Sequence, residues 1–167
     1  MSEQAEETAV ADGDSTALAL ERARAVIGVR RKRRCLVTAR DIRRFAQAIG
    51  ETCPVRDDDD PSLVAPPLFC QTLSYEELPL ELLPPDGSPK ELDVPLPAKR
   101  VVGGSSEFTL YRRVHAGELL EVVTWLKDVR IKQGKSGPLY LVAVETQCLD
   151  SDGNPVSTEV ATYVKRP

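Results

Sequence analysis

Histidine and cysteine are scarce in this sequence, which limits the metal and nucleophilic chemistry open to it. His115 is the single histidine, and the four cysteines, Cys35, Cys53, Cys70 and Cys148, are scattered with no Cys-x-x-Cys spacing. A zinc site needs a closely spaced ligand set, so we expect no metal and four reduced thiols, mostly buried. A Ser-His-Asp or Cys-His catalytic site would have to use His115.

The sequence also lacks long apolar runs and an excess of positive charge. No stretch approaches the ~20 consecutive apolar residues of a membrane span. The acidic N-terminus has no basic region followed by an apolar run, so we expect a cytoplasmic protein without a membrane partner. The formal charge of −4 disfavours nucleic acid as the main partner, because phosphates require a cationic face.

The composition and length are those of one globular domain. Hydrophobic residues make up 41% and charged residues 29% of the 167 positions. Residues 1–16 are polar and acidic, so we expect a disordered tail ahead of a domain over residues 17–167. The basic cluster at residues 30–34 follows a short amphipathic helix over Ala17–Ile27. We interpret it as an exposed edge segment whose cations discourage strand pairing, with contact to a ligand phosphate as the alternative.

Two further helices precede a series of strands. Thr38 is positioned to cap a helix that ends at Gly50, and the four aspartates at residues 57–60 read as a solvated turn, not a calcium loop. A second helix begins at Ala65–Phe69 and extends into SYEEL. Because LFCQTL is apolar almost all round, this helix should be buried. The proline-rich connection that follows is typical of a binding loop or flap.

The C-terminal part of the sequence predicts long antiparallel strands. Period-two patterning covers residues 101–114, 119–132, 138–150 and 155–166, and the SDGN segment is a strong hairpin turn. Long twisted strands beside one apolar helix indicate an α+β fold in which the sheet wraps around that helix.

Four segments carry a family resemblance through their order and spacing: TARDIRRFAQAIGETCPV, APPLF, VPLPAKRVVGGSSEFTLYRRVHAGELL and KSGPLYLVAVETQCLDSDGNPV. Over about residues 18–166 the chain resembles the MaoC-like dehydratase N-terminal family, with FAS1-like dehydratases and R-specific enoyl-CoA hydratases as relatives. The resemblance implies a single hot-dog domain that pairs side by side with itself or with another hot-dog subunit. It also implies hydration of an enoyl thioester, or the reverse, with coenzyme A or acyl carrier protein as substrate carrier and no cofactor.

Active relatives carry a signature of glycine, aspartate, any residue, asparagine, proline, an apolar residue and histidine, which falls on residues 50–56. Three positions match, namely Gly50, Pro54 and Val55. Glu51 replaces the aspartate, Cys53 the asparagine and Arg56 the histidine. Arginine stays protonated and cannot act as a base, and Glu51 is one methylene longer than the family residue.

These departures favour a substrate-shaping subunit whose hot-dog partner supplies the acid–base pair. Two alternatives stay open. The chain could be a homodimer that binds acyl thioesters in a regulatory role without catalysis, or a thioesterase that recruits Glu51. Release of free thiol from acyl-CoA would distinguish hydrolysis from hydration.

The candidates for substrate binding are Pro66, Pro67, Leu68, Phe69, Gly103, Gly104 and Arg100. The two prolines lack amide hydrogens, so an oxyanion donor at that helix start must be the amide of Leu68 or Phe69, or come from elsewhere. These two side chains line either the core or an acyl tunnel. The two glycines mark either a bulge or a close approach to an acyl or pantetheine chain, and Arg100 either contacts a coenzyme A phosphate or is solvated.

Overall fold

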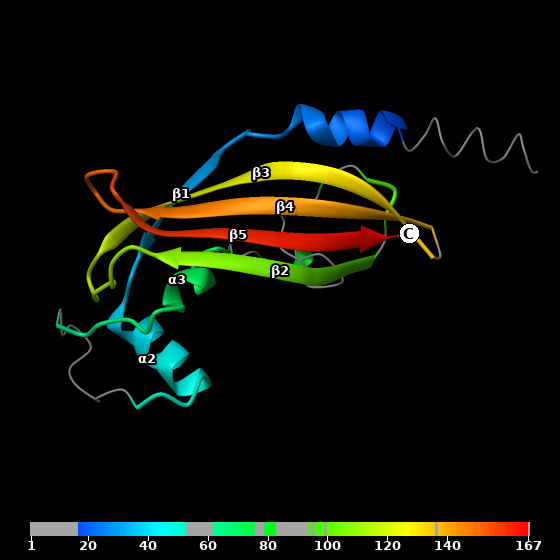
Figure 1. Ribbon diagram of the computed structural model, residues 1–167. Coiled ribbons are helices and arrows are strands. Elements are labelled where there is room, and N and C mark those ends of the chain that lie inside the picture. The colour runs from blue at the N-terminus through cyan, green and yellow to red at the C-terminus, as the bar shows by residue number, and fades with distance from the viewer. Residues whose placement is uncertain are drawn as a thin grey trace, which may run out of the picture.

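The computed structural model describes residues 17–52, 62–75, 79–82, 94, 96–98, 100–135 and 137–166. The predicted disordered tail, the aspartates at 57–60 and most of the proline-rich connection lie outside these residues. Five strands form one antiparallel sheet in the order β1-β3-β4-β5-β2 (Figure 1). The strands are β1 (Arg31–Leu36), β2 (Arg100–Leu110), β3 (Leu119–Gly134), β4 (Gly137–Leu149) and β5 (Pro155–Arg166). The helices are residues 17–25, α2 (Ala39–Ala48), α3 (Phe69–Thr72) and the 3-10 turn η1 (Leu80–Leu82).

The four long strands follow the predicted pattern, and tight turns set their register. The β4–β5 turn is organised by Asp150, whose Oδ1 accepts the backbone amides of Asp152 at 3.0 Å and Asn154 at 2.8 Å. Gly153 adopts a φ of +83° in this turn, which favours glycine. The SDGN segment therefore forms the predicted hairpin turn.

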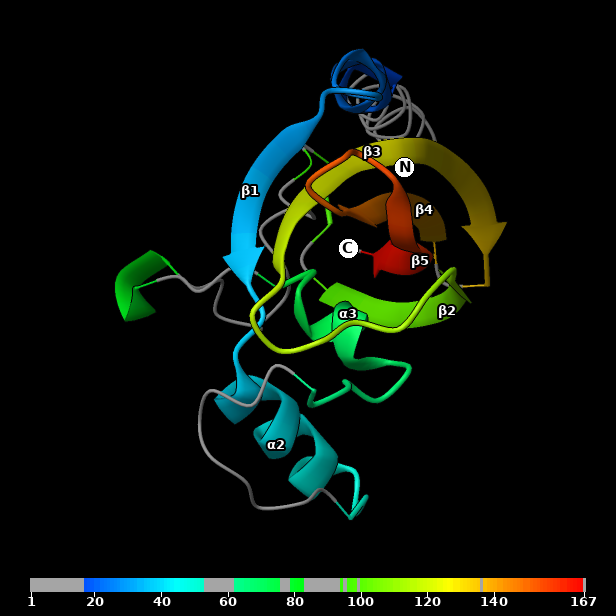
Figure 2. The same cartoon turned by 90° about the vertical axis from the view of Figure 1, so that its left-hand side faces the viewer.

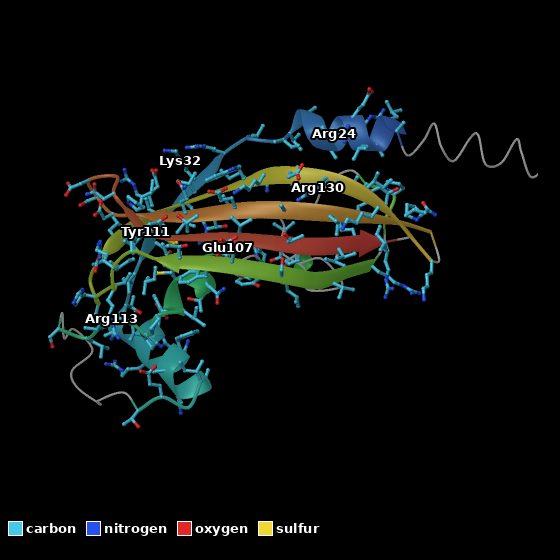
Figure 3. All side chains as sticks on the ribbon, in the orientation of Figure 1. Arg24, Lys32, Glu107, Tyr111, Arg113 and Arg130 are labelled. Atoms are coloured by element: carbon cyan, nitrogen blue, oxygen red, sulfur yellow. The ribbon has the colours of Figure 1, made fainter. Side chains whose placement is uncertain are left out.

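Strand β1 occupies one edge of the sheet, as the basic cluster predicts. Lys32 lies on β1 (Figure 3) and forms an ion pair of 2.8 Å with Glu121 of β3. The guanidinium carbon of Arg30 lies 4.7 Å from the centroid of the Trp125 ring, also on β3. The run of four cationic residues at the start of β1 opposes the addition of another strand to this edge.

Helix α2 begins as predicted but buries less of its apolar stripe. The Thr38 side chain accepts the Asp41 amide at 3.1 Å, which satisfies one donor of the first turn. Ile42 and Ala46 are buried, whereas Ile49, near the end of the same apolar stripe, is 54% exposed. Gly50 follows at a φ of +73° and ends the helix.

Helix α3 is buried at its start, but it is much shorter than predicted. It ends at Thr72 and does not extend into SYEEL. The Thr72 hydroxyl donates to the Phe69 carbonyl at 2.7 Å, a local bond that competes with helix continuation. Arg33 of β1 then donates to the carbonyl oxygens of Leu73 and Tyr75, so the chain turns toward the edge strand.

Two apolar clusters lie along one face of the sheet. Near α3, Phe69 and Cys70 pack with Ile42 of α2 and with Leu120 and Val122 of β3. Farther along the strands, Ala23 of the N-terminal helix packs with Leu126 and Val129 of β3 and with Val142 and Val144 of β4. Figure 2 shows α3 between the edge strands β1 and β2, with α2 farther from the sheet. The predicted α+β arrangement is confirmed, with a short helix in place of a long one.

The helices of the described part of the chain are too short or too polar to cross a bilayer.

A pair of alanine substitutions tests the close approach of β2 and β5. The register between these strands shifts at Gly103 and Ser105. A Cβ on Gly104 would lie 2.7 Å from the Thr162 carbonyl oxygen, whereas one on Gly103 would meet nothing within 4 Å. Gly104→Ala should therefore lower the free energy of unfolding by about 1–3 kcal/mol in urea denaturation. Gly103→Ala is the control, and an equal loss in both variants would contradict this account.

Candidate functional site

A pocket of about 450 Å³ opens between α3 and the sheet, in the region between the two apolar clusters. Its walls come from the end of α3 and from the central strands. The lining residues are Gln71, Thr72, Ser74, Tyr75, Thr124, Val144, Thr146, Glu159, Ala161 and Tyr163. The pocket lies beside the point where α3 stops, so the early end of the helix leaves this part of the sheet uncovered.

The sheet register brings polar side chains side by side on the pocket floor. Thr124 pairs with Thr146, and Thr146 in turn pairs with Glu159, across β3, β4 and β5. The two buried threonine hydroxyls lie 3.2 Å apart and hydrogen-bond to each other. Because these hydroxyls satisfy one another, the threonines add little unmet polarity to the floor.

Among the described residues that line the pocket, Glu159 alone carries a charge. Its Oε1 accepts hydrogen bonds from the Ser106 hydroxyl at 2.6 Å and the Gln71 amide at 2.9 Å. Its Oε2 accepts from the Ser74 hydroxyl at 3.3 Å. The carboxylate therefore links β2, α3 and the turn after α3, and it faces the pocket from β5.

A second, more open groove of about 670 Å³ lies between β1, α2 and α3. Three arginines, Arg33, Arg34 and Arg44, contribute to its lining. Arg34 and Arg44 form no ion pair with any described residue, so they are available to an anion. Thr72 and Tyr75 line both the groove and the pocket, which places positive charge next to the pocket.

The turn between β2 and β3 supports the segment that leads into α3. His115 forms an isolated bridge with Val64, just before the start of α3. Arg112 forms two hydrogen bonds with the Glu118 carboxylate, at 2.8 and 3.1 Å, and the His115 amide donates to the same carboxylate at 2.7 Å. Burial alone would raise the pKa of Glu118, but the bonds from Arg112 and His115 outweigh it and lower that pKa. The His115 side chain is exposed, and the residue contributes to this turn through its backbone amide.

Three free thiols gather under α3. Cys70 and Cys148 are buried and Cys35 is partly buried, as predicted, whereas Cys53 lies outside the described residues. A hydrogen bond that the Cys148 thiol donates to Cys70, together with burial, raises the pKa of Cys148. A buried thiol of raised pKa stays protonated, so Cys148 acts here as a small apolar group.

Of the three positions that depart from the catalytic signature, the structure describes Glu51. Glu51 is exposed just after α2 and does not line the pocket. Arg56 and Cys53 lie outside the described residues. The role of these three positions stays a prediction.

The candidates for substrate binding are divided between core and surface. Pro66 is buried and Pro67 exposed; Leu68 is 49% exposed, and Phe69 is 1% exposed with its ring edge-on to Phe45. Gly103 and Gly104 flank the bulge in β2, and Arg100 is exposed at the start of that strand. These residues do not line the pocket. Phe69 does line the second groove between β1, α2 and α3, which we call the arginine groove after Arg33, Arg34 and Arg44.

Sequence reasoning missed the polar residues that do line or support the pocket. Ser106, Gln71 and Glu159 were not among the candidates. The available signal was the strand phase of β5, because period two places Glu159 on the same face as Ser157 and Tyr163. A charged residue on the inward face of a strand marks a polar site, but only once the phase is known.

Comparisons with known proteins place this geometry in a family. A family model described as FAS1-like, dehydratase domain region, matches residues 25–159. A UPF0336 protein of Saccharopolyspora erythraea is 29% identical over 132 residues, which cover 75% of this chain and 78% of that protein. A UPF0336 protein of Clavibacter michiganensis subsp. michiganensis is 30% identical over 138 residues, which cover 78% and 85%.

Solved structures show the same fold. The ChsH1–ChsH2 complex from Mycobacterium tuberculosis matches with a TM-score of 0.62 at 21% identity, over 92% of each chain. The C-terminally truncated HadBC (3R-hydroxyacyl-ACP dehydratase) complex from the same organism matches with a TM-score of 0.57 at 21% identity, over 81% of this chain and 92% of that one. These similarities confirm the predicted hot-dog domain.

The Glu118 cluster predicts a specific response to acid. A carboxyl group with a lowered pKa in the folded state stabilises the fold above its unfolded pKa, and this contribution is lost as the pH falls through the folded pKa. Glu118→Gln should therefore lose less stability than the wild-type protein as the pH falls below about 4, the ordinary pKa of glutamate. Urea midpoints measured across this acid range test the prediction. Glu107→Gln is the control on an exposed glutamate, and identical acid profiles for wild type and Glu118→Gln would contradict it.

Proposed function

The chain belongs to the FAS1-like dehydratase domain family, and from that premise we propose that it is the substrate-shaping subunit of an enoyl-thioester hydratase or dehydratase. Its substrate is an acyl group carried by coenzyme A or acyl carrier protein. The acyl group occupies the pocket between α3 and the sheet. A second hot-dog subunit supplies the residues that move protons.

One observation carries this proposal: the pocket has room for an acyl chain but no acid–base pair. Hydration requires a base that deprotonates water and an acid that protonates the α-carbon. The described lining includes no histidine, and its one carboxylate, Glu159, already accepts three hydrogen bonds. The family signature loses its histidine at Arg56 and its aspartate at Glu51. The lining of the pocket and the altered signature both support a partner subunit that carries the intact aspartate and histidine.

The charges on the two edge strands favour pairing through β2 over pairing through β1. Edge β1 carries the run RKRR, whose charges discourage strand addition. Edge β2 runs to 11 residues, and from Val101 to Leu110 its only charged residue is Glu107. A long edge with little charge is an open template for another strand. The similar structures named above are complexes, which also favours a paired state.

The arginine groove supports a phosphate-bearing carrier. Coenzyme A and the phosphopantetheine of acyl carrier protein both carry phosphate groups, which arginine binds through charge-assisted hydrogen bonds. Arg34 and Arg44 lie in a groove that shares Thr72 and Tyr75 with the pocket. The neighbouring positions of groove and pocket suit a ligand with an anionic carrier and an acyl group.

Assays on the purified chain test the division of roles. Alone, it should bind acyl-CoA but not hydrate crotonyl-CoA or longer enoyl-CoAs. Together with a hot-dog subunit that carries the intact aspartate and histidine, it should turn these substrates over. Brisk hydration by the chain alone that is lost in Glu51→Ala, but kept in the control Glu81→Ala, would overturn the proposal.

Lysine substitutions test the pairing edge. Ser105 and Thr109 are exposed on β2. The double variant Ser105→Lys with Thr109→Lys should shift the protein to monomer in light scattering, because paired edges would bring the added charges together. The double variant Ser151→Lys with Gln133→Lys adds the same charge in the hairpin regions and should remain paired. Unchanged mass for the β2 variant would place the interface elsewhere.

A further inference from the structure

The pocket wall combines an apolar surface with one carboxylate. Val144, Ala161 and the rings of Tyr75 and Tyr163 offer apolar contact. Thr124 and Thr146 direct their hydroxyls at each other, at 3.2 Å. Glu159 is therefore the one group of the wall that carries a formal charge, and it sets the polarity that a bound ligand meets.

The hydrogen bonds of Glu159 leave acceptor capacity on the pocket side. A carboxylate offers about four lone-pair positions. Ser106 and Gln71 occupy two positions at Oε1, and Ser74 occupies one at Oε2. Glu159 forms no ion pair within the described part of the chain, so its charge is balanced only by neutral donors.

A plain hydrocarbon chain would be a poor match for this wall. It would displace water from the carboxylate without replacing the lost hydrogen bond, which carries a desolvation cost. A hydroxyl on the acyl group would donate to Oε2 while the rest of the group packs on the apolar wall. The donor has to be remote from the thioester, because the proposed chemistry takes place outside this pocket.

On the basis of the proposed function, we propose that Glu159 selects acyl groups that carry a hydroxyl donor some distance from the thioester. The substrate class is a hydroxylated acyl chain on its carrier. Glu159 is then a specificity residue that contacts the substrate, and Gln71, Ser74 and Ser106 hold its carboxylate in place.

Calorimetric titration with matched ligands tests this inference, with the partner subunit present where it copurifies. The probes are ω-hydroxyacyl-CoA, the plain acyl-CoA and the ω-methoxyacyl-CoA, over chain lengths from butanoyl to dodecanoyl. At the length that reaches Glu159, the hydroxyl should tighten binding about tenfold over both other ligands, since a hydrogen bond to a charged group contributes about 1.5–3 kcal/mol. The methyl ether keeps the oxygen but has no proton to donate, which isolates the donor.

Two variants assign the preference to the carboxylate. Glu159→Gln keeps the shape and an acceptor oxygen but removes the charge, so the hydroxyl preference should shrink. Glu159→Met removes the acceptor, so the preference should vanish while the plain acyl-CoA binds at least as tightly. Glu21→Gln makes the same charge change on the exposed face of the N-terminal helix and should leave all affinities unchanged. Thermal unfolding of each variant verifies that it is folded.

The outcomes separate this inference from the proposed function. Equal affinity of the wild-type protein for hydroxylated and plain acyl-CoA at every length overturns the inference and leaves the acyl pocket standing. A hydroxyl preference that persists in Glu159→Met overturns it as well. The ligand comparison on the wild type decides the question even where a variant does not fold. Absence of binding by every acyl-CoA rejects the proposed function and this inference together.

Discussion

The early end of α3 leaves the neighbouring face of the sheet open as a pocket, and the candidate site depends on it. Continued for two more turns, the helix would cover the sheet face between the two apolar clusters. Instead, Arg33 binds the carbonyl oxygens that follow Thr72 and draws the chain toward β1. The uncovered face becomes the pocket, and the sheet that would have formed core supplies its floor.

Glu159 connects the end of α3 to the sheet from β5. Its bonds to Gln71 and Ser74 attach the end of α3 to β5, while Ser106 connects it to β2. The same carboxylate lines the pocket, so one group serves packing and, on our proposal, ligand contact as well. Such double use explains how a charged residue can be tolerated on the inward face of a strand.

The fold could be predicted from the sequence more fully than the candidate site. Period-two patterning and the SDGN turn located the long strands, and the Thr38 cap located α2, because these features depend on local chemistry. The length of α3 was not predictable, since it depends on Arg33, which is about 40 residues away in the chain and reaches the helix only after the sheet forms. Glu159 was missed for the same reason: its partners come from three separate segments.

The proposed division of roles relates the pocket to the altered signature. A subunit that retains the catalytic aspartate and histidine must keep its surroundings rigid around the reacting atoms. Under the proposed function, a subunit with Glu51 and Arg56 at those positions is released from that constraint and can serve the acyl group. The space beside the one-turn helix α3 fits this role. On this proposal, the altered signature and the short α3 belong to one arrangement, in which binding and chemistry are divided between paired subunits.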